Sequence, residues 1–248
     1  MNNTLIIIPA YNQSKTIGAL LDRLKEPDIA SIADILVMND ASGDDTEAVV
    51  RSRDVAVVSH IYNLGYGSGL QLGYKYAVLH GYEYVIQMDA DGQHDISNIP
   101  EIYKALTTPD DEGKYPDIVL GSRFINGWKD YPTSLLKKIA YKLFGFLIRL
   151  GTRRKITDPT TGLQGLGKKA FSYYSRYGNF DDKYPDANML MQMLLLGFNV
   201  KEIKALMHTR KSGTSMHSGV IKPIIYMFRM SVSIIAVWIR IKLYKESV

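Results

Sequence analysis

The chain has 248 residues, 46% of them hydrophobic and 22% charged, and it contains no cysteine. These values fit one globular domain, with an appendage at most, and they exclude an intrinsically disordered chain, a polytopic membrane protein, disulfide bonds and thiolate metal sites. The net charge of +5 is unevenly spread, because residues 1–117 carry 8 lysines and arginines against 18 acids, whereas residues 118–248 carry 22 against 7; the basic part is expected to meet a phosphate-bearing substrate, a membrane or nucleic acid.

Strand and helix signals alternate through the first half of the chain. Short apolar runs are typical of buried strands, and apolar residues three and four positions apart are typical of helices. Strands are expected at residues 4–8, 35–38, 55–58, 84–88 and 118–120, and helices at 15–24, 42–51 and 97–106 and in the segment that ends at residue 79. Ser42 is predicted to cap the second helix. The alternation predicts a doubly wound α/β fold with a mostly parallel, Rossmann-like sheet.

Longer amphipathic segments follow residue 123. Helices are expected at 134–150, 186–196 and 220–243, with one more strand at 200–203. The change near residue 125 indicates a change of role within one domain more than a linker. The N-terminus lacks the basic start and long apolar run of a signal peptide, so export by that route is not expected.

Two acids one residue apart, Asp89 and Asp91, follow the predicted strand at 84–88. Side chains at positions i and i+2 of an extended chain point to the same side, so both carboxylates can address one cation. Ligands of open α/β sheets collect at the carboxyl ends of strands, and oxygen ligands suit Mg²⁺ or Mn²⁺ bridged to a diphosphate. The alternative is an acidic surface turn, because Asp and Gly are ordinary turn residues.

Asp40 follows the second predicted strand, where its carboxylate can accept hydrogen bonds from a nucleobase or a ribose, or cap the next helix. The glycines at positions 65, 67 and 69 follow the third strand and lack the spacing of a dinucleotide fingerprint. A nicotinamide cofactor is therefore not expected.

Six motifs, in this order, resemble family 2 of the nucleotide-sugar glycosyltransferases, especially the branch with dolichyl-phosphate mannosyltransferase and bacterial polyprenyl-phosphate glycosyltransferases. They lie at residues 6–12 (IIIPAYN), 39–42 (NDAS), 63–65 (NLG), 89–94 (DADGQH), 121–124 (GSRF) and 157–162 (TDPTTG). The resemblance implies a GT-A fold. It makes residues 1–125 the nucleotide-sugar half and residues 126–219 the acceptor half of one glycosyltransferase domain.

The resemblance also implies roles for single residues. The nucleotide sugar would contact Pro9, Tyr11, Asn12, Asp40, Asp89, Ala90 and Gln93. Asp91 would hold the metal ion itself, Asp89 would hold the ribose or a metal-bound water, and Gln93 would line the sugar pocket. Family members often carry two acids where this chain has Asn39 and Asp40, so uracil and guanine both stay open as the base.

Basic residues of the second half are candidates for phosphate binding. Arg123 is expected to approach the donor or acceptor phosphates, because a planar guanidinium binds two oxygens at once. Arg210 and Lys211 are expected to join it, followed by a loop at 212–219 that would close over the donor. The alternative for these residues is a solvated basic surface.

Asp158 and Asp186 compete for the role of catalytic base. Asp158 is preferred because it lies in one of the six motifs, whereas Asp186 precedes an apolar helix and a helix cap would also explain it. Asp181 and Asp182 are further candidates.

Two segments, residues 137–155 and 220–243, combine apolar with basic residues, a pattern typical of helices in a membrane interface. The longest uncharged stretch of the second, residues 230–239, has 10 residues, short of the roughly 20 that span a bilayer. Residues 220–248 are therefore expected to lie on the cytoplasmic face of the cell membrane without crossing it. The alternative is a helix packed on the protein's own core or on a partner.

These observations predict an inverting, metal-dependent hexosyltransferase that moves a sugar from a nucleotide diphosphate to polyprenyl phosphate, for cell-surface glycan synthesis. An alternative acceptor is a sugar hydroxyl of a lipid-linked glycan in capsule or cell-wall polysaccharide assembly. A membrane protein or a second copy of the chain is a further candidate partner. A catalytically silent nucleotide-sugar sensor would not need the two acids, and nucleic-acid binding is not expected because the basic residues alternate with aliphatic ones.

Overall fold

The computed structural model describes residues 2–127, 133–208 and 221–244. Its strands are β1 (Thr4–Ala10), β2 (Ala33–Asn39), β3 (Ala56–Ser59), β4 (Tyr84–Gln87), β5 (Ile118–Ser122), β6 (Gln164–Gly167) and β7 (Val200–Lys204). Its helices are α1 (Ile17–Leu24), α2 (Pro27–Ala30), α3 (Thr46–Arg51), α4 (Tyr66–Leu79), α5 (Asn98–Thr107), α6 (Leu135–Thr152), α7 (Lys168–Ser175), α8 (Ala187–Leu195) and α9 (Ile221–Tyr244).

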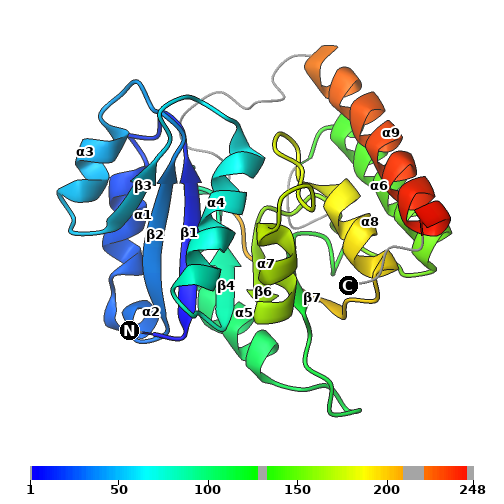
Figure 1. The fold of residues 1–248 in the computed structure, drawn as a ribbon, viewed down its shortest axis with the longest axis horizontal. Coiled ribbons are helices and arrows are strands. Elements are labelled where there is room, and N and C mark those ends of the chain that lie inside the picture. Colours follow the sequence, from blue (N-terminus) through cyan, green and yellow to red (C-terminus); the bar gives the residue numbers. More distant parts are fainter. Residues whose placement is uncertain (1, 128–132, 209–220, 245–248) are drawn as a thin grey trace.

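All seven strands form one sheet in the order β3-β2-β1-β4-β6-β5-β7 (Figure 1). Only β6 runs antiparallel to its neighbours β4 and β5, and the other neighbouring pairs are parallel. The predicted α/β class with a mostly parallel sheet is confirmed. Strands from both sides of residue 125 share this sheet, so the division at residues 125 and 219 stays a prediction about role.

Two apolar cores lie on opposite faces of the sheet, because successive side chains of a strand point to opposite sides. On β1, Leu5 and Ile7 pack with α4 and α7, whereas Ile6 and Ile8 pack with α1 and α5. This alternation fixes the register of each strand. Because β1, β2, β4 and β5 run in the same direction, their carboxyl ends lie at one edge of the sheet, the upper edge in Figure 1.

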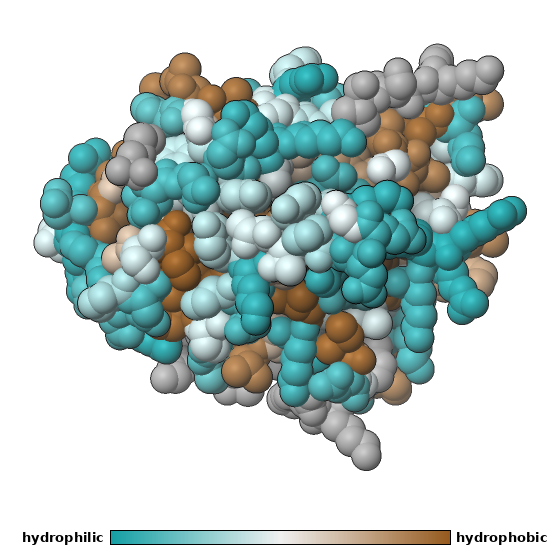
Figure 2. Space-filling view, turned by 90° about the horizontal axis from the view of Figure 1, so that it is seen from below, coloured by the Kyte–Doolittle hydropathy of each residue, from teal (hydrophilic) through white to brown (hydrophobic). Residues whose placement is uncertain are grey.

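Helices α6, α8 and α9 form a separate layer beside the sheet and contact one another (Figure 1). Phe144 of α6 and Met230 and Ile234 of α9 are buried in the core on that side. Seen from the opposite end of the strands, the surface is mainly hydrophilic with hydrophobic residues in separate patches (Figure 2).

The expected elements of the first half are present, but two predictions need correction. Ser42 does not cap α3, because that helix begins at Thr46 and the Ser42 hydroxyl instead accepts the Asn12 backbone N–H. The C-terminal helix is also not too short to cross a membrane: the stretch Lys222–Leu243 is long and apolar enough by length and composition, and only 17% of its apolar window is buried.

Candidate active site

The loops that follow four strands meet at the upper edge of the sheet. Tyr11 follows β1, Asp40 follows β2, Asp89 and Asp91 follow β4, and Arg123 follows β5. The sheet therefore brings together side chains that are up to 112 positions apart in the sequence. This is the edge at which open α/β sheets bind ligands.

Asp89 and Asp91 present carboxylates of different exposure. The Asp89 side chain is 33% exposed and its Oδ1 accepts the Tyr66 hydroxyl at 3.0 Å, whereas Asp91 is buried and its Oδ1 accepts the Gln93 backbone N–H at 3.0 Å. Among the described residues no cluster of three or more His, Asp or Glu forms a closed metal cage. Two carboxylates fit a hard cation that also binds ligand oxygens, as Mg²⁺ does with phosphates.

Gly162 borders the Asp89 carboxylate. A Cβ atom at this position would lie 2.8 Å from Asp89 Oδ2 and 3.3 Å from its Cγ and Oδ1. Such distances are too short for a side chain, so glycine keeps the space around the carboxylate open.

His94 holds Asp89 in place through a hydrogen bond to its backbone. Its Nδ1 accepts the Asp89 backbone N–H at 3.1 Å, so the neutral ring carries its proton on Nε2, 3.9 Å from Asp89 Oδ2. Burial lowers the pKa of His94, which keeps the ring neutral despite the nearby carboxylates. No role was predicted for His94 from the sequence, although it ends the DADGQH motif.

Asp40 is buried, and its carboxylate holds the loop between β3 and α4. Oδ1 accepts the Leu64 N–H at 2.9 Å and lies 2.7 Å from His60 Nδ1, and Oδ2 accepts the Gly65 N–H at 2.9 Å. Gly65 has φ +103°, a conformation that favours glycine. Asp40 thus fixes the backbone of Leu64 and Gly65 beside the strand ends, and it does not cap α3.

The loops after β1 and β2 are tied to each other by Asn12, which has φ 53° and accepts the Gly43 N–H at 2.8 Å. The neighbouring Tyr11 is 49% exposed. An exposed ring at the end of β1 is available to stack on a nucleobase.

Gln93 joins the carboxylate loop to the end of β7, because its backbone oxygen accepts the His208 N–H at 2.7 Å. Ala90 is buried below it, and Pro9 is in β1. The predicted phosphate-binding residues Arg210 and Lys211, and the loop at 212–219, lie outside the described residues.

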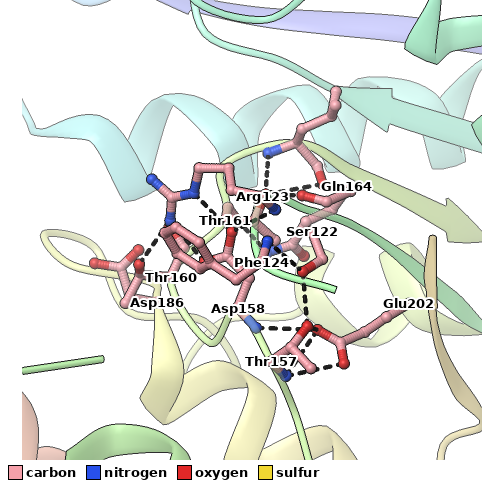
Figure 3. Close-up of polar contacts among 12 residues, drawn as sticks. Ser122, Arg123, Phe124, Thr157, Asp158, Thr160, Thr161, Gln164, Asp186 and Glu202 are labelled. Atoms are coloured by element: carbon pink, nitrogen blue, oxygen red, sulfur yellow. Dashed lines mark hydrogen bonds and ion pairs between the residues drawn. The ribbon is translucent and has the colours of Figure 1, made fainter. Parts of the chain in front are cut away.

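Arg123 and Asp158 form a buried, two-pronged ion pair (Figure 3). Arg123 Nε and one terminal nitrogen each donate to an Asp158 oxygen at 2.6 Å, and the Arg123 backbone N–H donates to Asp158 Oδ2 at 3.0 Å. The same terminal nitrogen donates to Thr160 Oγ1 at 3.1 Å. The Asp158 side chain is fully buried, so its carboxylate holds the guanidinium in one orientation.

Glu202 of β7 supports this pair from below. Its carboxylate accepts the backbone N–H groups of Thr157 and Asp158 at 2.9 to 3.0 Å and the Thr157 hydroxyl at 2.8 Å. The segment that carries Asp158 is therefore anchored to the sheet.

Asp186 lies just before α8 and points toward the Arg123 guanidinium (Figure 3). Burial raises the pKa of Asp186 to about 6; the Tyr226 hydroxyl and Arg123 act in the opposite direction, and Asp89 and Asp181 add to the rise. The Asp186 carboxylate makes no capping hydrogen bond to α8. Asp186 is thus a candidate base with a pKa close to the neutral range.

Several site contacts came from residues that the sequence did not single out. Tyr66, His94, Gly162, Glu202 and Tyr226 all touch a candidate residue, and Tyr66 and Tyr226 do so across 23 and 40 positions. No spacing within the sequence signals such contacts. His94 and Gly162 could have been found, since each ends one of the six motifs.

Comparisons with known proteins identify the family of the chain. A model of glycosyl transferase family 2 matches residues 5–175. An uncharacterized protein of Methanocaldococcus jannaschii is 34% identical over 170 residues, 68% of this chain and 64% of that protein. The undecaprenyl-phosphate mannosyltransferase of Micrococcus luteus is 28% identical over 223 residues, 87% of each chain.

A solved structure has the same fold. Glucosyl-3-phosphoglycerate synthase of Mycobacterium tuberculosis, in complex with Mn²⁺, uridine diphosphate and glucosyl-3-phosphoglycerate, superposes with a TM-score of 0.65 at 17% identity, and the match covers 96% of this chain and 78% of that chain. This likeness identifies the fold as GT-A.

Proposed function

The chain belongs to glycosyltransferase family 2 and is a glycosyltransferase, and we propose that it transfers a hexose, with inversion, from a nucleoside diphosphate sugar to polyprenyl phosphate at the inner face of the cell membrane. One observation carries the proposal: the Asp89–Asp91 pair, Arg123 and Asp186 face the same edge, close enough that Asp89 and Arg123 both act on the pKa of Asp186. The name of the Micrococcus luteus relative supports the lipid phosphate as the acceptor.

The donor would bind beside the carboxylate pair. Asp91 and Asp89 would hold Mg²⁺ or Mn²⁺, which when bound neutralises charge on the departing diphosphate. Tyr66 and His94 fix the Asp89 carboxylate for that task, and Gly162 leaves it room. Tyr11, Asn12 and Asp40 would form the nucleoside side of the same edge.

The acceptor would bind beside Arg123. Asp158 and Thr160 hold the guanidinium in one orientation. A planar guanidinium fixed in this way is suited to bind phosphate oxygens. A phosphate monoester has a second pKa near 6, close to the pKa of Asp186, about 6, so the acceptor's last proton can pass to Asp186 at little cost. The acceptor oxygen then bonds to the anomeric carbon as the bond to the diphosphate breaks and the diphosphate leaves with the electron pair.

Helices α6 and α9 would meet the membrane. Their large apolar side chains are exposed on both helices: Leu135, Ile139, Phe146 and Leu150 on α6, and Ile224, Ile225, Phe228, Val232, Ile235, Trp238, Ile239 and Leu243 on α9. On α9 the polar Ser233 and Arg240 face α8 instead. A helix with polar residues inward and apolar residues outward suits a lipid surface, and the basic residues of both helices suit anionic lipid.

A second acceptor remains a candidate because of Asp186. A carboxylate whose pKa is about 6 is also suited to remove the proton of a sugar hydroxyl. The direct test offers the purified protein a panel of radiolabelled nucleotide sugars with polyprenyl phosphate in detergent, with and without Mn²⁺. Label in the lipid phase supports the proposal, and label in a lipid-linked glycan only would assign the hydroxyl acceptor.

Membrane binding gives a first prediction. The protein is expected to sediment with anionic liposomes at low salt and to be released as ionic strength rises, because basic residues near anionic lipid contribute about 1 kcal/mol each and salt screens them. Phe228→Glu should weaken sedimentation, since Phe228 is 70% exposed on α9. Tyr177→Glu is the control, because Tyr177 is also an exposed aromatic residue, at 96%, but lies between α7 and α8. Equal loss in both variants, or no sedimentation of the wild type, would contradict the membrane surface.

Gly162 gives a second prediction. Gly162→Ala should weaken Mn²⁺ binding in the presence of nucleoside diphosphate by about tenfold, because the new methyl group must displace the Asp89 carboxylate. Gly69→Ala in α4 is the control, because its Cβ would lie 3.8 Å from Met38 Cβ of β2, an ordinary van der Waals contact. Calorimetry measures both affinities, and an unchanged affinity in Gly162→Ala would remove Asp89 from the metal site.

A further inference from the structure

Three polar residues of α9 form a stripe that faces α8. They are seven positions apart, which is two helical turns, so they lie on one side of the helix. The hydroxyl of Tyr226 donates to Asp186 Oδ2 at 2.6 Å, Ser233 Oγ accepts from Asn188 Nδ2 at 3.0 Å, and Arg240 donates to Gln192 Oε1 at 2.5 Å. The exposed apolar residues of α9 lie on the opposite side, so one helix presents lipid-facing groups outward and this stripe inward.

Tyr226 is the member of the stripe that reaches the candidate active site. Its ring is held between the rings of Phe144 and Tyr184, with centroids 6.0 and 5.8 Å away. Burial raises the pKa of Tyr226, so the hydroxyl keeps its proton and acts as the donor. A donor 2.6 Å from a carboxylate oxygen makes a short, charge-assisted hydrogen bond.

The Asp186 carboxylate lies among several charged and titratable groups, and the Tyr226 hydroxyl donates a hydrogen bond to it. The charged and titratable groups that act on the carboxylate are Asp89 after β4, Arg123 after β5, Asp181 before α8 and Tyr226 on α9, and Tyr66 of α4 also faces it. No capping bond from α8 orients the carboxylate. Tyr226 also lines a cavity, together with Asp181, Tyr184, Arg229, Met230 and Ser233.

We propose that Tyr226 is a positioning residue of the acceptor site: its hydroxyl orients the Asp186 carboxylate, and the lipid-facing helix α9 is thereby part of the reaction machinery as well as an attachment. The inference rests on the role proposed for Asp186 in accepting the acceptor's proton. The Asp186 carboxylate is then correctly oriented toward an acceptor from the membrane only when α9 is packed on α8.

The test is Tyr226→Phe in the full chain, which removes one oxygen and keeps the ring contacts. Without the donor the ionised form of Asp186 is less favoured, so its pKa rises further. The acidic limb of the kcat/KM profile should move up by about one pH unit, a tenfold loss on the acidic side, while activity recovers at high pH. The acceptor phosphate also ionises near pH 6, but its own pKa does not depend on which variant of the protein is used. A shift of the limb between variants therefore reports on the protein.

Ser233→Ala is the matched control. It removes a hydrogen bond between the same two helices without touching Asp186, so it should leave the profile in place. A pH titration of the Asp186 side-chain carbon by NMR, assigned with Asp186→Asn, gives a readout without turnover, and its midpoint should rise in Tyr226→Phe only.

The outcomes separate the inference from the proposed function. If the wild type transfers sugar and Tyr226→Phe and Ser233→Ala shift alike, or neither shifts, the inference is overturned and the function stands. If the wild type transfers no sugar to lipid phosphate, the proposed function has failed, and the NMR midpoint still decides whether Tyr226 controls Asp186. Liposome sedimentation should be equal in all three proteins.

Discussion

Replacing Asp91 by Asn is expected to reduce transfer by about a hundredfold or more, because a neutral amide cannot replace the anionic ligand that a hard cation prefers and several kcal/mol of charge stabilisation depend on that cation. The fold should survive. Asp91 Oδ1 accepts the Gln93 backbone N–H, and an Asn side-chain oxygen can accept the same bond. The measurements are kcat/KM across a range of Mn²⁺ concentrations, Mn²⁺ affinity by calorimetry and the thermal midpoint.

Asp95→Asn is the matched control for Asp91→Asn. Asp95 lies in the same loop, and its carboxylate bonds His208 and Ser97, so its replacement can cost stability but should leave Mn²⁺ affinity intact. Activity above about a tenth of wild type in Asp91→Asn under limiting metal would show that the several kcal/mol expected from metal catalysis do not pass through this residue. A chelator added to the wild type checks metal dependence independently.

The strands that could be predicted are those with continuous apolar runs. Residues 4–8 read as a buried strand because both faces of β1 are covered by helices. β6 could not be predicted, because Gln164–Gly167 contains two glycines and no β-branched residue. Gly165 is required by tertiary packing, because a Cβ at this position would lie 2.3 Å from Ile102 of α5. The close approach of the helix to the strand therefore selects glycine.

The candidate site divides in the same way. Asp89, Asp91 and Arg123 could be located because each sits in a motif directly after a strand. What each carboxylate does could not be predicted, because the partner comes from elsewhere in the chain: Asp158 meets Arg123 across 35 positions and Asp186 meets Tyr226 across 40. The preference for Asp158 as the base came from its motif, and the structure gives that motif a second purpose, holding Arg123.

The prediction that α9 is too short to cross a membrane was wrong for a related reason. A sequence window shows how many charges a helix carries but not which way they face. Arg240 interrupts the apolar run of α9, yet it turns inward to Gln192, so the outward face stays apolar for longer than the uncharged stretch indicates.

The two candidate acceptors predict opposite orders of severity for Asp186→Asn and Arg123→Lys. A phosphate monoester is largely a dianion above its second pKa near 6, so with polyprenyl phosphate Asp186→Asn should cost less than about tenfold at pH 8 and more near pH 6. A sugar hydroxyl keeps its proton at either pH, so the same variant should then cost about 10² to 10⁴ fold throughout.

Arg123→Lys keeps the charge and removes the planar fork. With a phosphate acceptor it should raise KM for the acceptor and lower kcat/KM strongly, because two oxygens can no longer be bound together. With a hydroxyl acceptor its effect should be mild and confined to the donor. Measuring kcat/KM at pH 6 and 8 for both variants therefore assigns the acceptor.

Asp158→Asn must be interpreted separately in this series. Asp158 is fully buried against Arg123, and removing one partner of a buried ion pair typically costs about 3 to 5 kcal/mol. Its loss of activity should come with a lower thermal midpoint and should match Arg123→Lys in acceptor KM, because both variants release the guanidinium from its fixed orientation. Asp186→Asn should instead keep the thermal midpoint, since at pH 7 it replaces a desolvated carboxylate by a neutral group of equal size. A large pH-independent loss in Asp186→Asn, with Arg123→Lys close to wild type, would overturn the lipid phosphate in favour of the sugar hydroxyl.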